Sequence, residues 1–197
     1  MPDPGRMKRH DPVIQTCTMN SQDADSYQPN SSALFPDDAA ILSLPSDIQP
    51  QQCLYFHGIR ICLEMTWLGY QRLLGSLWAA TQNPSERLYR ILGFADAWSI
   101  VDSVHRLRGL LDQLPGVKKK RSLGFRRFRE ETAAVEDFRH FIQHLRNEVP
   151  DLAAGQLAVM GTLSWCVLRD PAGGELSVCS CTPGPRFRES RVALQNP

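Results

Sequence analysis

One arginine and two histidines lie close together near the end of a helical pattern in the second half of the chain. They are Arg139, His140 and His144. With 3.6 residues per turn, His140 and His144 lie one turn apart on the same face of a helix, and Arg139 lies at the edge of that face. A neutral imidazole can accept a proton near neutral pH, and a guanidinium can hold a phosphate through two hydrogen bonds. These residues could therefore cleave a phosphodiester without a metal.

The same side chains are compatible with three further roles. The histidines could belong to a solvated surface, or they could be buried and pair with Glu64, Asp102 or Asp112 of a neighbouring helix. Two histidines at this spacing can also bind zinc, but no third ligand is evident in the sequence. We therefore expect neither a metal site nor a cofactor.

The apolar residues predict three main helices that would position this group. Their spacing places the helices at about residues 59–82, 86–113 and 125–148. Asn83 and Pro84 separate the first two helices, with Ser85 as the expected cap of the second. Pro115-Gly116 ends the second helix and Pro150 ends the third.

Two apolar, β-branched runs follow the helices, at about residues 156–168 and 174–181. The Pro/Gly-rich segment between them is typical of a hairpin turn. The aromatic run at 53–57 could add a third strand, with Gly58 as a hinge before the first helix. The predicted fold is mainly α: a short helical bundle of about three main helices with an appended C-terminal β-hairpin.

The stretch R-H-F-I-Q-H, from Arg139 to His144, resembles the R-x(4–6)-H motif of HEPN domains. These domains are short helical bundles that commonly dimerise, and many are metal-independent endoribonucleases of toxin–antitoxin, phage-defence or RNA-processing systems. The resemblance implies that His144 is the general base, that Arg139 binds phosphate and that His140 is a supporting polar group. It also implies RNA, a second copy of the chain and a protein such as an antitoxin as partners.

Two polar residues of the second predicted helix could support this site. Asp102 lies four residues before Arg106 and can form an ion pair within the helix. Alternatively, Asp102 or His105 packs beside His144 and orients its imidazole.

A basic segment precedes the third predicted helix. Phe125 and Phe128 lie among its positive charges, and aromatic rings can stack on unpaired bases while cations contact phosphates. A solvated loop between helices would carry the same charges. The candidate nucleic-acid-binding residues are Lys118, Lys119, Lys120, Arg121, Arg126 and Arg127.

The composition sets the limits of these predictions. The chain has 197 residues, of which 42% are apolar, enough for one domain with a packed core. We expect a disordered polar tail at 1–50, the helical domain with its hairpin at 51–183 and a mobile tail at 184–197. The net charge of +1 requires neither a nucleic-acid nor a membrane partner.

The first residues lack the apolar core of a secretory signal, and no run approaches the roughly 20 apolar residues that span a bilayer. We therefore expect a cytoplasmic protein that does not contact a membrane and whose six cysteines are reduced. The alternative to a HEPN-like RNA-binding protein or ribonuclease is a non-catalytic helical module for dimerisation or protein interaction.

Overall fold

The computed structural model describes residues 34–116, 122–155, 157–170 and 175–182. This part of the chain is mainly helical with a C-terminal antiparallel hairpin, which confirms the predicted fold class. Residues 118–121 and the tail at 184–197 lie outside the described residues. The elements are α1 (Pro50–Gln82), α2 (Arg87–Gln113), α3 (Leu123–Glu131), α4 (Ala134–Gln143), α5 (Leu145–Ala154), β1 (Leu163–Asp170) and β2 (Glu175–Cys181).

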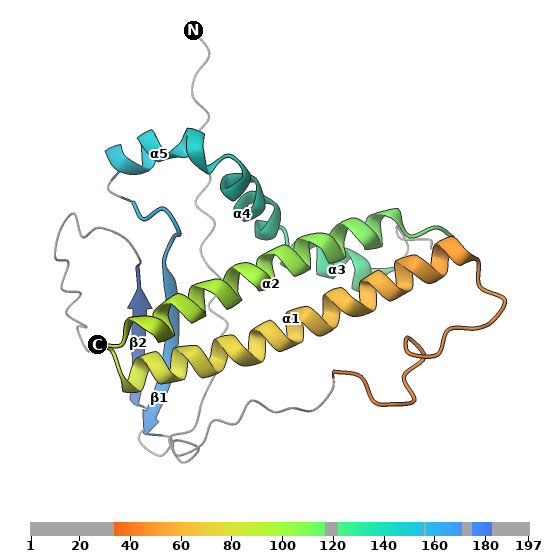
Figure 1. Cartoon of the computed structure of the whole chain (residues 1–197), viewed down its shortest axis with the longest axis horizontal. Coiled ribbons are helices and arrows are strands. Elements are labelled where there is room, and N and C mark those ends of the chain that lie inside the picture. Colours follow the sequence, from red (N-terminus) through yellow and green to blue (C-terminus); the bar gives the residue numbers. More distant parts are fainter. Residues whose placement is uncertain (1–33, 117–121, 156, 171–174, 183–197) are drawn as a thin grey trace, which may run out of the picture.

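The two long helices α1 and α2 pack against each other in opposite directions and form the centre of the fold (Figure 1). The break between them lies at Asn83 and Pro84, as the sequence predicted. Glu86, and not Ser85, caps α2, because its carboxylate accepts a hydrogen bond from the backbone N–H of Leu88 at 3.0 Å. The buried core between the helices contains Ile59, Cys62, Leu107 and Leu114.

The predicted third strand does not exist, because residues 53–57 form the second turn of α1. Tyr55 and Phe56 pack against the core from this helix. Gly58 is therefore no hinge; it allows α2 to approach, since a Cβ there would lie 3.0 Å from Leu110 Cδ1. Of the tail expected at 1–50, residues 1–33 lie outside the described residues. The described remainder forms turns before α1, and Ile41 packs against the core.

The single helix predicted at 125–148 is also wrong, because this segment contains α3, α4 and the start of α5. The first interruption lies at Thr132 and Ala133. The second lies at His144, whose backbone (φ −105°, ψ 13°) leaves the helical region. Pro150 does not end the last helix; α5 continues to Ala154 with one backbone hydrogen bond fewer. Leu152, which is buried, secures that last part of α5.

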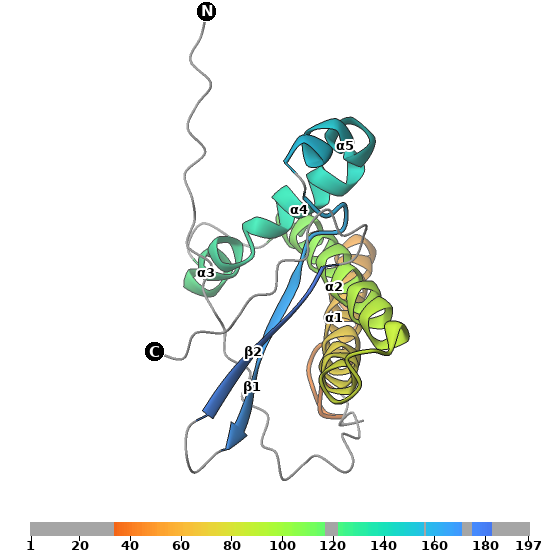
Figure 2. The same cartoon turned by 90° about the vertical axis from the view of Figure 1, so that its left-hand side faces the viewer.

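The β-hairpin lies beside the α1–α2 pair (Figure 2). Trp165 is paired with Cys179 and Val167 with Ser177 in the antiparallel register. Val167 is buried, and the indole N–H of Trp165 donates to Thr81 Oγ1 of α1 at 2.9 Å. A two-stranded hairpin is only marginally stable alone, so these contacts with the helices stabilise it.

The buried face of α2 differs from its most apolar face. Leu88, Ile91 and Leu92 are apolar, but they are exposed. Small and polar residues face the interior in their place, among them Gly93, Asp96, Ser103 and Arg108. Gly93 lets α1 and β1 approach closely, and Asp96 accepts hydrogen bonds from Arg72 of α1 at 2.6 and 2.9 Å.

Two glycines test how tightly α1 and α2 pack. A Cβ at Gly69 would lie 3.1 Å from Ile100 Cγ1, whereas nothing lies within 4 Å of a Cβ at Gly109. Gly69→Val should lower the free energy of unfolding by about 1–3 kcal/mol through overpacking. Gly109→Ala should raise it by up to about 1 kcal/mol through helix propensity. Urea denaturation measures both changes, and an equal or higher stability of Gly69→Val would contradict the close packing.

Candidate functional site

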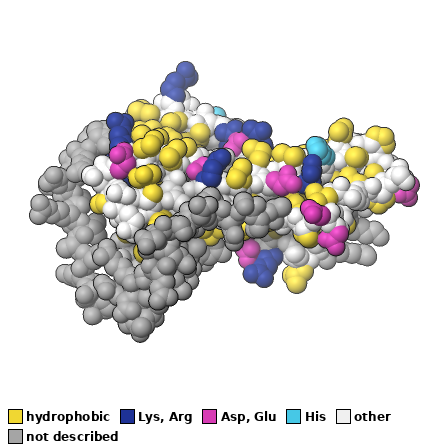
Figure 3. All heavy atoms as spheres, turned by 60° about the horizontal axis from the view of Figure 1, so that its bottom comes forward, with side chains coloured by type: hydrophobic (Ala, Val, Ile, Leu, Met, Phe, Trp, Pro, Cys, Tyr) yellow, Lys and Arg dark blue, Asp and Glu magenta, His cyan; other side chains and the backbone are white. Residues whose placement is uncertain are grey.

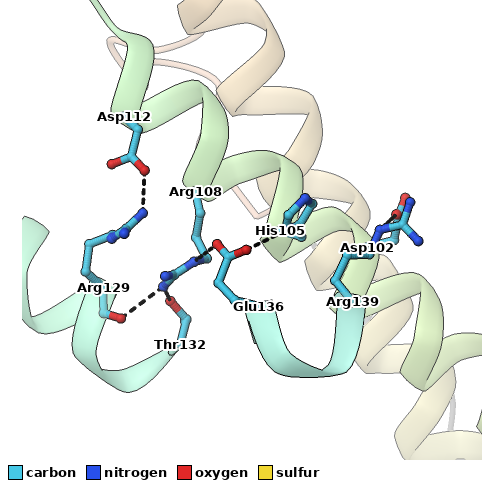
Figure 4. Close-up of polar contacts among 8 residues, drawn as sticks. All are labelled: Asp102, His105, Arg108, Asp112, Arg129, Thr132, Glu136 and Arg139. Atoms are coloured by element: carbon cyan, nitrogen blue, oxygen red, sulfur yellow. Dashed lines mark hydrogen bonds and ion pairs between the residues drawn. The ribbon is translucent and has the colours of Figure 1, made fainter. Parts of the chain in front are cut away.

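A buried arginine attaches the short helices to α2. Arg108 is 3% exposed, so its charge must be paired inside the protein. Its guanidinium donates to Glu136 Oε1 at 2.8 Å, to Thr132 Oγ1 at 2.5 Å and to the carbonyl of Arg129 at 2.9 Å (Figure 4). These acceptors lie on α3, on α4 and between them. Arg108 therefore fixes the position of the helix that carries the candidate motif.

Further polar pairs extend this contact in both directions along α2. We call Asp102, His105, Arg108 and Asp112, with their partners on α3 and α4, the polar row (Figure 4). Asp112 pairs with Arg129, and His105 Nδ1 lies 3.1 Å from Glu136 Oε2. Sequence reasoning missed Arg108, although an arginine between Leu107 and Leu110 on a buried helix face is a recognisable signal.

Glu136 is the shared acceptor of the polar row. Its two oxygens meet the side chains of Arg108 and His105. The hydrogen bond from Arg108 is the main cause that lowers the pKa of Glu136, and His105 adds to it. Glu136 therefore stays ionised at neutral pH and neutralises the buried guanidinium.

Arg139 lies at the last position of the polar row. Its Nε is 3.3 Å from Asp102 Oδ1, while Asp102 Oδ2 accepts a hydrogen bond from Arg106 at 2.8 Å. The predicted ion pair between Asp102 and Arg106 is confirmed. Two guanidinium groups and one carboxylate leave one net positive charge. Arg139 is partly exposed and lines a cavity of about 270 Å³ together with Trp98, Val101, Asp102, Ile142 and Met160.

The two histidines face solvent. His140 and His144 are exposed, and their ring centroids lie 4.5 Å apart. His144 is the single residue between the end of α4 at Gln143 and the start of α5 at Leu145. Neither histidine is among the described residues that line the cavity at Arg139. The three residues of the motif therefore lie together at the end of α4, but the guanidinium of Arg139 turns toward α2 and the two imidazoles turn outward.

The contacts of Asp102 and His105 differ from the predicted support of His144. Asp102 pairs with Arg106 and Arg139, and His105 faces Glu136. These residues orient α4 through its arginine and its glutamate, and the described contacts do not join either of them to His144.

The basic segment is described only in part. Arg126 and Arg127 are exposed on α3, and Arg127 Nε donates to Glu131 Oε1 at 2.7 Å. Lys118, Lys119, Lys120 and Arg121 lie outside the described residues. Phe128 packs against the core and is therefore no platform for a stacked base.

Comparisons with known proteins provide no further support for the interpretation of the motif. Comparisons with family models, with curated proteins and with solved structures find no match. Within the described part of the chain, no helix is long and apolar enough to cross a membrane. The same part holds no group of three or more potential metal ligands, and its cysteines are free. The resemblance to HEPN domains therefore rests on the motif.

The ion pair between Arg108 and Glu136 gives a pH-dependent prediction. Glu136→Gln should lower the free energy of unfolding at pH 7 by about 1–2 kcal/mol, because Arg108 stays buried without its carboxylate and Glu136 is itself partly solvated. The pKa of Glu136 is lower in the folded state, so its contribution is present above the ordinary glutamate pKa and is lost as the pH falls through the folded value.

The difference in the free energy of unfolding between Glu136→Gln and the wild type should therefore become smaller at acidic pH. Urea denaturation at pH 7 and below the ordinary glutamate pKa measures it. Glu131→Gln is the control, since its pair with Arg127 is exposed to solvent and should contribute little to stability. Equal stability of wild type and Glu136→Gln at pH 7 would show that the polar row does not hold α4.

Proposed function

We propose that the chain is a HEPN-like RNA-binding protein that cleaves single-stranded RNA without a metal at the junction of α4 and α5. The exposed, adjacent imidazoles of His140 and His144, within about one turn of Arg139, carry this proposal. Imidazole can transfer protons near neutral pH, and an exposed position gives an RNA strand access to it.

His144 acts as the general base in this proposal. It takes the proton of a ribose 2′-hydroxyl, whose oxygen attacks the adjacent phosphorus. The bond from phosphorus to the 5′-oxygen breaks, and a proton from solvent completes the leaving hydroxyl. The products are a 2′,3′-cyclic phosphate and a 5′-hydroxyl end, and His140 supports the base through its ring contact.

Arg139 supplies the positive charge for the phosphate in this proposal. Because its guanidinium faces Asp102 of α2 and the imidazoles face outward, it must turn away from Asp102 to reach the same phosphate as His144. Arg106 already donates a hydrogen bond to Asp102, and Arg139 Nε has no hydrogen-bond partner of its own despite its short distance to Asp102. The guanidinium can therefore exchange its ion pair for a phosphate without leaving the carboxylate unpaired. Charge-assisted hydrogen bonds from arginine to phosphate are among the stronger polar contacts in proteins.

The test is cleavage of single-stranded RNA by purified protein in EDTA. Cleavage should fall at least about 100-fold in His144→Ala, because a positioned base contributes that much or more, and it should also be lost in Arg139→Ala. His57→Ala, which removes an exposed histidine of α1, should cleave like the wild type. Circular dichroism checks that Arg139→Ala folds. Cleavage that survives in His144→Ala would end the assignment of the base.

A second candidate function, a helical module that dimerises, is favoured by the apolar outer face of α1. Leu54, Ile61 and Leu68 are 73%, 37% and 55% exposed, and they lie seven residues apart. Met65, also exposed, lies between the last two. Figure 3 shows how apolar side chains gather in groups between charged ones on one face of the molecule. Heptad spacing suits the pairing of two helices along such a face.

The oligomeric state tests this candidate. Light scattering coupled to size exclusion should give the mass of a dimer for the wild type and of a monomer for Leu68→Glu, because a charge inside the paired face has no partner. Leu92→Glu places the same charge on an exposed leucine of α2 and should stay dimeric. A monomeric wild type would contradict the proposal, as would a dimeric Leu68→Glu.

A further inference from the structure

A second and larger cavity lies between the first half of α2 and the end of β2, and it adjoins the cavity at Arg139, with which it shares Trp98 and Met160. Its volume is about 820 Å³, within the range of small-molecule sites. Phe94, Trp98 and Met160 contribute an apolar surface to it, whereas Arg87 and Arg90 contribute positive charge. None of the described residues that line it is acidic.

Arg90 is fixed where it can meet a ligand. One end of its guanidinium donates to the carbonyl of Pro84 at 2.6 Å, which leaves its other N–H groups for a further acceptor. Its charge reaches across the cavity, because it opposes the effect of burial on Cys181 of β2. Burial still raises the pKa of the Cys181 thiol, which favours its neutral form.

We propose that this cavity binds a small organic anion that has one carboxylate on an apolar body. The carboxylate lies at Arg87 and Arg90, and the body packs along Phe94 and Trp98. Two guanidinium groups at one end of an apolar surface match a molecule with the same division of charge and hydrophobicity.

A nucleic acid fits this cavity less well. A polynucleotide needs cations along its whole length, but the surface becomes apolar between Arg90 and Trp98. Arg139 lines the adjoining cavity together with Trp98, but Asp102 holds it in an ion pair. The site shares Trp98 and Met160 with the cavity at Arg139, but it contains none of the residues assigned to the proposed ribonuclease, Arg139 and the two histidines.

Calorimetric titration of the full chain with dodecanoate tests the proposal. The wild type should bind it, and dodecyltrimethylammonium, which has the same chain and the opposite charge, should bind at least about tenfold more weakly. Replacing both arginines by glutamine (Arg87→Gln with Arg90→Gln) should weaken dodecanoate binding by a similar factor. Arg60→Gln removes a cation of α1 and should bind like the wild type.

Ala95→Phe provides a second variant, because Ala95 is exposed and lines the cavity, so a larger side chain fills it without removing charge. It should also weaken binding. Equal binding of both surfactants, or full binding by the arginine double variant, would show adsorption on other apolar surface and overturn the proposal. Displacement of dodecanoate by a short oligoribonucleotide would assign the cavity to RNA instead. His144→Ala should bind dodecanoate like the wild type. The binding test and the ribonuclease test can therefore fail independently of each other.

Discussion

The burial of the Arg108 guanidinium is the constraint on which the arrangement of the second half of the chain depends. A charge removed from water must find acceptors inside the protein. Arg108 finds them at the carbonyl of Arg129, the hydroxyl of Thr132 and the carboxylate of Glu136, which belong to successive turns of chain. At the interruption near Thr132, the N–H of Ala133 donates to the carbonyl of Glu130 instead of the carbonyl of Arg129, and the guanidinium of Arg108 binds the Arg129 carbonyl. The interruption between α3 and α4 and the burial of Arg108 therefore occur at the same contact.

The same constraint sets the direction in which α3 and α4 run. Asp102, His105 and Asp112 of α2 face Arg139, Glu136 and Arg129 in that order, so partner numbers fall as numbers on α2 rise. The two segments are thus antiparallel along the polar row (Figure 4). A sliding of α4 by one turn would separate several charged pairs at once. Position and direction of the motif helix are therefore specified by polar contacts more than by apolar burial, and no residue of α3 or α4 is fully buried.

This accounts for which features the sequence could predict. Apolar spacing was sufficient for α2, for the hairpin and for α1 from about residue 59 onward, but it missed the start of α1 at Pro50. The apolar residues Leu88 and Ile91 are exposed, because the buried face of α2 includes Gly93, Asp96 and Ser103 instead. The break at Thr132 could not be predicted from local pattern, and the buried Arg108 that contacts Thr132 lies 24 residues away. For the candidate site, the spacing of four residues was enough to predict the ion pair between Asp102 and Arg106. The contact between Arg139 and Asp102 could not be predicted, because it depends on how α4 packs against α2.

The hydrogen bonds of the polar row are complete at Arg108 and incomplete elsewhere. The guanidinium of Arg108 has acceptors on both short helices, whereas Arg139 Nε, like Nδ1 of His105, is buried without a hydrogen bond. A buried donor without an acceptor costs free energy, and pairing Arg139 as Arg108 is paired would stabilise the fold. If the polar row served only to hold α4 in place, a hydrogen-bond acceptor for Arg139 would add to the stability of the fold. Arg139 therefore marks a position where stability has not been maximised. It lies at the edge of a cavity and near two exposed imidazoles in the sequence. Residues that bind or react are commonly found at such positions.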